Sequence, residues 1–318
     1  MHRALWFSAL LLGFALPTRA VLFYGTSDPA FNTTAPTGAL QDSGWQLEGT
    51  WGASLGTPIA ANLFVTAKHL GGSVGDSFTF NGTSYQTTAV FDSANSDLRV
   101  WQVNGTFSTY ATLYRGGDAA LTGQSAVVFG RGTQRGGAVT VSGQTLGWTW
   151  GTSDQVQRWG QNNVDGVTAG GASLGNLLRF GFNAGAGANE AHLSSGDSGG
   201  AVFIQSGGVW KLAGINYSVD GQFNYTGTDG QGFNAALFDA RGLYFGHDGS
   251  WQLINGTNPV VSSFYATSIT DNLTFLDGVI TPVPEVGEVA RLGCVMCALG
   301  LLVEALGRWA RRGPSDQR

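Results

Sequence analysis

The chain has 318 residues, of which 16 are Lys or Arg and 21 are Asp or Glu, so that only 12% are charged. An apolar content of 42% excludes a disordered polyampholyte, because such chains lack the apolar surface that offsets chain entropy. Collagen is excluded as well, since the 50 glycines follow no Gly-X-Y period and there are only 8 prolines. A net charge of −5 offers phosphates no cationic field, and no nucleic-acid partner is expected.

The first 20 residues have the features of a signal peptide. His2 and Arg3 form a short basic start, residues 5–16 are almost wholly apolar, and Ala20 ends a Thr-Arg-Ala sequence. Small residues therefore stand at the two positions that signal peptidase reads. We expect residues 1–20 to be a signal peptide and the mature chain to start near Val21. A buried N-terminal helix is the alternative.

Residues 281–318 differ from the body of the chain. A Pro-Val-Pro-Glu sequence ending at Glu285 is followed by an apolar run of 12 residues, Leu292–Val303, and then by a cluster of Arg308, Arg311 and Arg312. The run predicts a hydrophobic helix, but a bilayer span takes about 20 residues. This order resembles the PEP-CTERM sorting tail of exported bacterial proteins, which an exosortase removes, although Val286 stands where that family has Pro. A weak membrane anchor or amphipathic tail is the alternative.

The body, residues 21–280, is acidic and contains no cysteine. It carries nine basic and 17 acidic residues, a net charge of −8, so neutral polar residues must cover most of its surface. Both cysteines, Cys294 and Cys297, lie in the tail, where they are most simply apolar residues of a helix. The body therefore has no disulfide, and packing must stabilise it.

Short strand-like stretches separated by glycine fill residues 40–280, and no long segment shows a helical apolar period. Asn81-Gly82 separates two such stretches, residues 77–80 and 83–91, and Asn104-Gly105 separates residues 98–103 from 106–114. Because Asn-Gly supplies the positive φ angles of tight turns, we expect two hairpins. Many short strands at close spacing predict an all-β barrel or sandwich. Further strands are expected at residues 60–67, 125–129, 138–141, 146–150, 177–182, 201–205 and 209–219.

The most informative segment is Gly-Asp-Ser-Gly-Gly, residues 196–200. A serine between glycines can occupy a tight turn on which backbone amides converge, as an oxyanion hole requires. Ser198 is thus a candidate nucleophile, and the alternative is a structural glycine turn. A serine needs a base, and the body has three histidines, His69, His192 and His247.

His69 follows a strand-like run, at the point where a strand gives way to a loop. Asp97 stands at the start of another strand, where an acid can be buried at a barrel end and orient an imidazole. Asp92 is its nearest competitor. Taken alone, each residue could be an ordinary strand-end side chain.

Three segments resemble the motifs of the trypsin/chymotrypsin-like serine peptidases, in the family's order: Val65–His69, Ser96–Leu98 and Gly196–Gly200. The resemblance implies two six-stranded antiparallel β-barrels, at about residues 40–115 and 116–275, with the site between them. It implies an exported serine endopeptidase acting on a protein or peptide through an acyl-enzyme, without a cofactor. His69 would be the general base, Asp97 would orient it and Ser198 would attack, with the amides of Gly196 and Ser198 as the oxyanion hole.

The chain departs from the family at two positions near the serine. Six residues before it, where trypsin-like members have an acid that binds basic substrate side chains, this chain has His192. His192 is therefore a candidate pocket residue that would favour an acidic or polar substrate side chain, with packing in the pocket wall as the alternative. In the family, the acid that matches Asp197 pairs with the amino group that cleavage at an activation site sets free. That site is a basic residue followed by a sequence like Ile-Val-Gly-Gly, and no clear example of it precedes His69. The partner of Asp197 would then be either the amino group freed by maturation at Val21 or another group of the chain.

Two other function classes compete with the peptidase. The Gly-x-Ser-x-Gly pattern also fits an α/β-hydrolase, but that fold needs a helix after the serine, and residues 201–205 predict a strand. A non-catalytic surface or extracellular-matrix protein on a peptidase scaffold stays open. No metal site is expected, because the three histidines lie far apart and no acidic cluster has ligand spacing.

Overall fold

The computed structural model describes residues 21–281. The predicted signal peptide lies outside the described residues, as does the predicted tail apart from Thr281. The strands all belong to one compact unit that ends at Phe275. One α-helix, α1 (Leu273–Ile280), closes the described part, and none of its helices is long and apolar enough to span a membrane. The 3-10 helices are η1 (Gly38–Leu40), η2 (Trp45–Leu47), η3 (Lys68–Leu70), η4 (Asp118–Ala120) and η5 (Thr270–Asn272).

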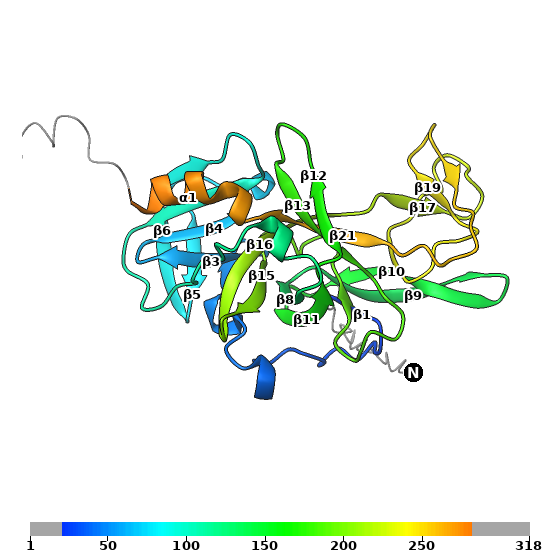
Figure 1. Ribbon diagram of the computed structural model, residues 1–318, viewed down its shortest axis with the longest axis horizontal. Helices are drawn as coiled ribbons and strands as arrows, with labels where there is room; N and C mark the ends of the chain where they lie inside the picture. Colours follow the sequence, from blue (N-terminus) through cyan, green and yellow to red (C-terminus); the bar gives the residue numbers. More distant parts are fainter. Residues whose placement is uncertain (1–20, 282–318) are drawn as a thin grey trace, which may run out of the picture. The chain divides into compact units, whose positions relative to one another are not determined.

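The first half of the body is a closed barrel in the order β2-β3-β4-β7-β6-β5 (blue to cyan in Figure 1). Stacked Phe64 and Phe78, whose ring centroids are 3.8 Å apart, fill its interior together with Trp51 and Trp101. The strands are β2 (Gly49–Trp51), β3 (Ser54–Ala60), β4 (Leu63–Ala67), β5 (Ser77–Phe80), β6 (Thr83–Asp92) and β7 (Leu98–Val103).

One of the two hairpins expected from Asn-Gly is confirmed and the other is wrong. Asn81 and Gly82 have φ angles of 49° and 74° and join β5 to β6. After Asn104-Gly105 the chain forms no strand, because Asn104 Oδ1 accepts from Gln86 N at 2.7 Å and Phe107 turns into the barrel core. The following residues instead connect the two halves of the body.

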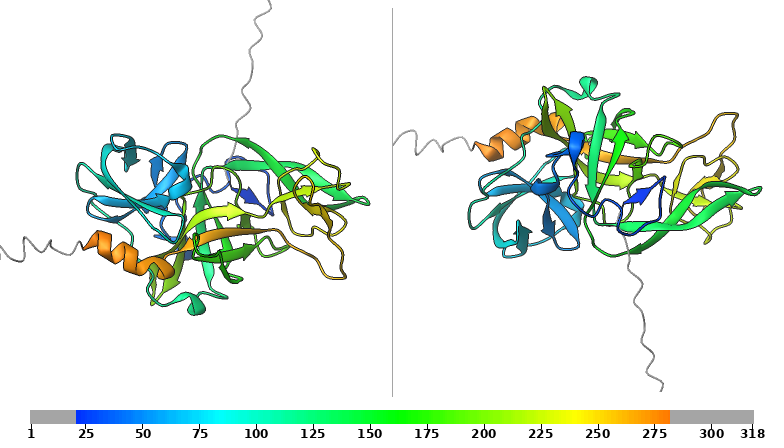
Figure 2. Two further views of the ribbon diagram at one scale, coloured as in Figure 1. Left: turned by 90° about the horizontal axis from the view of Figure 1, so that it is seen from above. Right: turned by 90° about the horizontal axis from the view of Figure 1, so that it is seen from below.

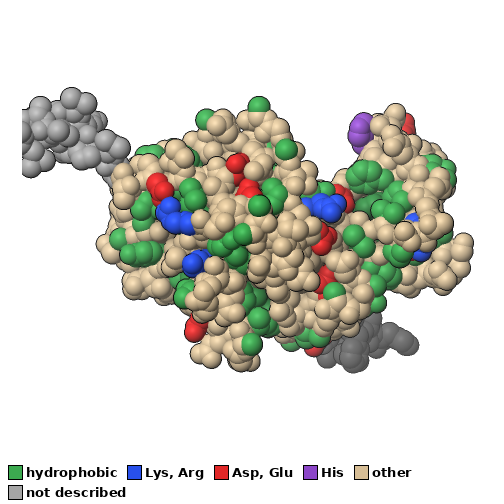
Figure 3. Space-filling model, viewed as in Figure 1, with side chains coloured by type: hydrophobic (Ala, Val, Ile, Leu, Met, Phe, Trp, Pro, Cys, Tyr) green, Lys and Arg blue, Asp and Glu red, His purple; other side chains and the backbone are tan. Residues whose placement is uncertain are grey.

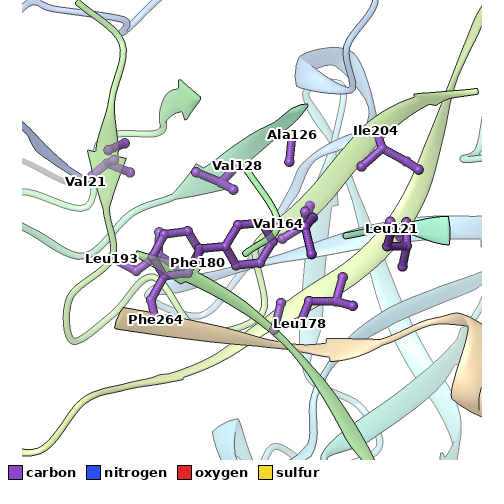
Figure 4. Packing of buried hydrophobic residues seen from close by; sticks show 14 of the residues in the cluster. Val21, Leu121, Ala126, Val128, Val164, Leu178, Phe180, Leu193, Ile204 and Phe264 are labelled. Atoms are coloured by element: carbon purple, nitrogen blue, oxygen red, sulfur yellow. The ribbon is translucent and has the colours of Figure 1, made fainter. Parts of the chain in front are cut away.

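The second half is built on a seven-stranded sheet in the order β11-β8-β15-β16-β21-β13-β12. Its main apolar cluster contains Phe180 and Phe264, stacked at 4.6 Å, with Val128, Leu178 and Ile204 around them (Figure 4). The strands are β8 (Ser125–Gly130), β11 (Arg158–Asn163), β12 (Gly166–Ala169), β13 (Asn176–Gly181), β15 (Ala201–Ser206), β16 (Val209–Val219) and β21 (Ser263–Ser268).

Three smaller sheets complete the second half. Two of them, β18-β10-β9 and β17-β19-β20, form a lobe that extends away from the first barrel (green and yellow in Figure 2). The third pairs the first described strand with the strand that contains His192. The strands are β1 (Leu22–Phe23), β14 (Ala191–His192), β9 (Thr133–Val141), β10 (Gln144–Ser153), β17 (Gln222–Asn224), β18 (Ala235–Leu237), β19 (Tyr244–Gly246) and β20 (Gln252–Leu253).

This architecture confirms the all-β, two-barrel fold class that the sequence predicted. The strand count of the second half differs, because its sheet has seven strands rather than six and its end strands β11 and β12 do not pair with each other. The face shown in Figure 3 is mostly neutral polar surface with scattered charges, as the low charged content requires.

Candidate active site

His69 lies where β4 of the barrel gives way to the short helix η3. Strand β4 is buried along its whole length, which fixes the start of this turn. The imidazole itself stays 40% exposed, so one edge of the ring is open to a ligand. Within residues 21–281, Nε2 of His69 has no hydrogen-bond partner, whereas Nδ1 is engaged.

Asp97 ends the turn between β6 and β7 and faces His69 from the neighbouring strand. Its Oδ2 lies 2.5 Å from His69 Nδ1, and its Oδ1 accepts from the backbone N–H of His69 at 3.0 Å. Lys68 N adds a third link by donating to the Asp97 carbonyl at 2.7 Å. The Asp97 side chain is only 6% exposed, so this carboxylate is directed at the imidazole rather than at water. The structure therefore brings His69 and Asp97 together, and the competitor Asp92 instead pairs with Arg99 at 2.6 Å.

Ser198 lies on the turn before β15, in the second half of the body. The turn packs directly against strand β3 of the barrel and the helix η3 that contains His69: a Cβ on Gly199 would lie 2.5 Å from Leu55 O and 2.8 Å from Leu70 Cδ1. Gly199 also has φ +83°, so that only glycine fits both the conformation and the space. The strand that follows, in place of a helix, excludes the α/β-hydrolase elbow.

The Ser198 hydroxyl does not donate to His69 in this structure. Its Oγ donates to the Tyr217 carbonyl at 3.5 Å, a long contact. Tyr217 also meets His69, ring edge to ring face, with centroids 5.9 Å apart. Ser198 and His69 are thus neighbours of the same tyrosine. Burial, together with the Asp97 charge, raises the pKa of Tyr217, which keeps that phenol neutral.

The loop before Ser198 presents unpaired amides. Among the described residues, none accepts a hydrogen bond from the backbone N–H of Gly196 or Ser198, whereas Gly199 N and Gly200 N are both bonded. Gly196 has φ +94°, and a Cβ there would lie 2.9 Å from Gly132 Cα. Free, fixed N–H groups beside a hydroxyl are what an oxyanion hole requires.

Asp197, whose partner the sequence left open, is held by neighbouring loops. Its Oδ1 accepts from Gly132 N at 2.7 Å, and its Oδ2 accepts from Ser194 N at 2.8 Å and Ser194 Oγ at 3.0 Å. The side chain is fully buried, and desolvation raises its pKa to about 7 although these hydrogen bonds act in the opposite direction. Asp197 thereby fixes the loop that carries Gly196 and Ser198.

A cavity of about 260 Å³ opens beside Ser198. Its walls combine apolar surface with hydroxyls, and its one charged lining residue, Asp197, has both oxygens engaged. Because burial raises the pKa of Asp197 to about 7, the cavity is largely uncharged below that pH. Its lining consists of Trp150, Leu193, Ser194, Ser195, Asp197, Ser198, Asn216, Tyr217, Ser218 and Val219.

His192 is not among these lining residues, contrary to the expectation of a pocket histidine. Its side chain is completely buried between the rings of Phe182 and Phe264, each with its centroid 5.6 Å away. Both ring nitrogens are occupied, Nδ1 by the Leu193 carbonyl at 2.6 Å and Nε2 by Ser262 Oγ at 3.2 Å. Burial lowers the pKa of His192 to about 4, so the ring is neutral and serves packing.

Two residues beside the site, Lys68 and Asn272, are not among those that the sequence motifs identify as functional. Lys68 occupies the position just before His69, and its ammonium group turns toward the loop of Asp97. Asn272, far along the chain, reaches the same loop. For Lys68, its place in the histidine motif was the one available sequence signal. No sequence signal pointed to Asn272. Among residues 21–281 no group of three or more His, Asp or Glu side chains is placed to hold a metal ion.

Comparisons with known proteins give no family assignment. No family model matches the chain, and no curated protein matches it. Among solved structures it is similar to a mutant of human heparin binding protein, at 13% identity over 77% of this chain and 96% of that one, with a TM-score of 0.45. It is also similar to the passenger domain of plasmid encoded toxin, an autotransporter enterotoxin of enteroaggregative Escherichia coli, at 15% identity over 70% of this chain, with a TM-score of 0.40. The chain spans 21% of that second protein's length.

Proposed function

We propose that the protein is an exported serine endopeptidase that cleaves peptide bonds through His69, Asp97 and Ser198. The observation that carries the proposal is the directed pair of His69 Nδ1 and Asp97 Oδ2, 2.5 Å apart, beside a serine on a glycine turn with unpaired amides. A buried carboxylate on one imidazole nitrogen, with the other nitrogen open, is the arrangement that a general base needs.

In the proposed reaction, Ser198 Oγ attacks the carbonyl carbon of the scissile bond while its proton passes to His69 Nε2. The N–H groups of Gly196 and Ser198 then stabilise the negative oxygen of the tetrahedral intermediate. His69 gives the proton to the leaving amine, and an acyl-enzyme remains on Ser198. Water, deprotonated by the same imidazole, releases the acid and regenerates the hydroxyl.

One rotation of a side chain must precede this chemistry. The long 3.5 Å contact between Ser198 Oγ and the Tyr217 carbonyl is easily broken, and catalytic hydrogen bonds often tighten only when substrate binds. Because Gly199 packs against Thr66 and Leu70, the serine is already on the barrel face that carries His69. Rotation about χ1 of Ser198 is the movement we propose.

The neutral cavity supports an uncharged substrate side chain on the acyl side of the bond. Apolar contact is available from Leu193, Val219 and Trp150, and the hydroxyls of Ser195 and Ser218 are open to a polar group. A preference for a charged side chain would need an opposite charge facing the substrate. The lining contains no Lys, Arg or His, and the oxygens of its one acid, Asp197, are bonded to Gly132 and Ser194.

Export, processing by signal peptidase and an exosortase, and any membrane contact through the tail belong to the same proposal. They rest on residues 1–20 and 282–318, which lie outside the described part of the chain. The substrate would then be an extracytoplasmic protein or peptide.

A non-catalytic surface or matrix protein is the second candidate. The absence of a hydrogen bond from Ser198 to His69 among the described residues favours it, because an unassembled site would bind without turnover. A pre-steady-state burst separates the two functions. With an activated ester of an uncharged amino acid, the peptidase predicts a burst of about one equivalent of product that is absent in Ser198→Ala and in His69→Ala. No burst from well-folded parent protein at any pH from 5 to 9 would favour the scaffold.

A further inference from the structure

The turn that presents Asp97 is hydrogen-bonded by two residues, Lys68 and Asn272, that do not touch the reacting atoms. Residues 93–97 join β6 to β7, so the carbonyls of Ser93 and Ser96 lie outside the strands and find their donor in a side chain. Such carbonyls need donors, since buried unpaired backbone groups are costly. Two side chains from distant positions provide the contacts.

Lys68 grips the turn from the histidine side. Its ammonium group donates to the carbonyls of Ser93 at 2.9 Å and Ser96 at 2.7 Å. An ammonium can donate to several acceptors at once, so one side chain closes both ends of the turn. Because Lys68 directly precedes His69, the same residue ties the imidazole segment to the loop of its carboxylate.

Asn272 grips the turn from the second half of the body. Its Oδ1 accepts from Ser96 Oγ at 2.6 Å and Ser93 Oγ at 3.1 Å, and its Nδ2 donates to the Ser268 carbonyl at 2.8 Å. Ser93, Ser96 and Asn272 are all buried, and Ser96 is completely inaccessible to solvent. Asn272 follows β21 of the seven-stranded sheet, so this contact links that sheet to the turn of Asp97.

We propose that Lys68 and Asn272 form a two-sided latch on residues 93–96 and act as positioning residues for the pair of His69 and Asp97. The latch stabilises the segment of His69 by hydrogen bonds. No disulfide can do so, because residues 21–280 contain no cysteine. It holds Asp97 so that one carboxylate oxygen meets the His69 amide and the other meets Nδ1. As a catalytic role, this inference rests on the proposed function.

The test compares variants that open one side of the latch with matched variants elsewhere. Lys68→Met and Asn272→Ala each remove one grip. Lys211→Met is the control for the first, because it removes the other lysine of the described chain, on β16. Asn224→Ala is the control for the second, because Asn224 is buried and braces a loop of the outer lobe by accepting from Thr226 N and donating to the Thr228 carbonyl. Lys68→Arg keeps a cationic donor and serves as the rescue.

Two readouts separate positioning from general stability. The low-field proton resonance of the hydrogen bond between His69 Nδ1 and Asp97 should weaken or disappear in both latch variants and persist in both controls. The rate of covalent labelling by a fluorophosphonate should fall about 10- to 100-fold in the latch variants, because small displacements of catalytic groups have effects of that size. Lys68→Arg should recover most of the rate.

Retention of the resonance in both latch variants would overturn the latch, and so would an equal loss in the controls. The resonance does not depend on catalysis, so it decides the latch even in a parent protein that shows no labelling. Absent labelling of the parent would count against the proposed function alone. If one latch variant fails to fold, the other still opens a side of the turn and decides the result.

Discussion

Replacing Gly199 by alanine tests whether close packing holds the Ser198 turn against the barrel. An L-residue at φ +83° costs about 1–2 kcal/mol. The new Cβ would also lie 2.5 Å from Leu55 O, a backbone atom that cannot rotate away, and overpacking of this kind costs typically 1–3 kcal/mol. We therefore expect Gly199→Ala to lower the free energy of unfolding by roughly 2–5 kcal/mol.

The matched control is Gly207→Ala, in the turn between β15 and β16. Gly207 also has a positive φ, +62°, but a Cβ there would meet nothing within 4 Å, so only the backbone cost applies. Urea unfolding followed by tryptophan fluorescence measures both variants, and fluorophosphonate labelling measures the effect on Ser198. Gly199→Ala should be less stable than the control by about 1–3 kcal/mol and label far more slowly. Equal stability and equal labelling of the two variants would refute the close packing of the turn.

Three further predictions concern the buried acids, the orienting carboxylate and the core. Burial raises the pKa values of Asp197 and Glu190 to about 7, so between about pH 4.5 and 7 the folded state keeps protons that the unfolded state loses, and stability should fall as pH rises. His192, with its pKa lowered to about 4, acts in the opposite direction, whereas the raised pKa values of buried Glu48 and Asp220 act in the same direction as those of Asp197 and Glu190. The double variant Asp197→Asn/Glu190→Gln should therefore make the slope less steep in urea unfolding, and an unchanged slope would contradict these assignments. Asp97→Asn should reduce turnover by roughly four orders of magnitude with little change in melting temperature, and near-normal turnover would give the orienting role to another group. Phe264→Ala should cost about 3–5 kcal/mol of stability, since its ring is fully buried against Phe180, whereas exposed Tyr110→Ala should change it by less than about 0.5 kcal/mol.

The parts of the fold that the sequence could predict are those that local patterns determine. The Asn81-Gly82 hairpin follows from backbone preferences at two residues, and it forms as expected. Asn104-Gly105 has the same two residues but a different outcome, because burial of Phe107 in the barrel outweighs the turn preference. A local sequence pattern cannot predict which of the two effects is larger, because the burial of Phe107 depends on residues far away in the sequence.

The candidate site divides in the same way. His69 and Asp97 could be predicted from motifs, and the structure brings their side chains together. His192 was misplaced because its position relative to Ser198 says nothing about the aromatic rings of Phe182 and Phe264, which enclose it. Asn272 and Ser96, which are hydrogen-bonded, lie 176 residues apart in the sequence. No local sequence pattern predicts a contact over that separation.

The central claim is that Ser198, and no other serine of the loop, is an activated nucleophile. Tandem mass spectrometry of the fluorophosphonate-treated body, after proteolysis, measures where the adduct forms. We expect one adduct per chain, on Ser198, formed faster as pH rises from 5 to 8 and abolished by His69→Ala. An adduct on the neighbouring Ser194 or Ser195, or none on a folded protein, would contradict it.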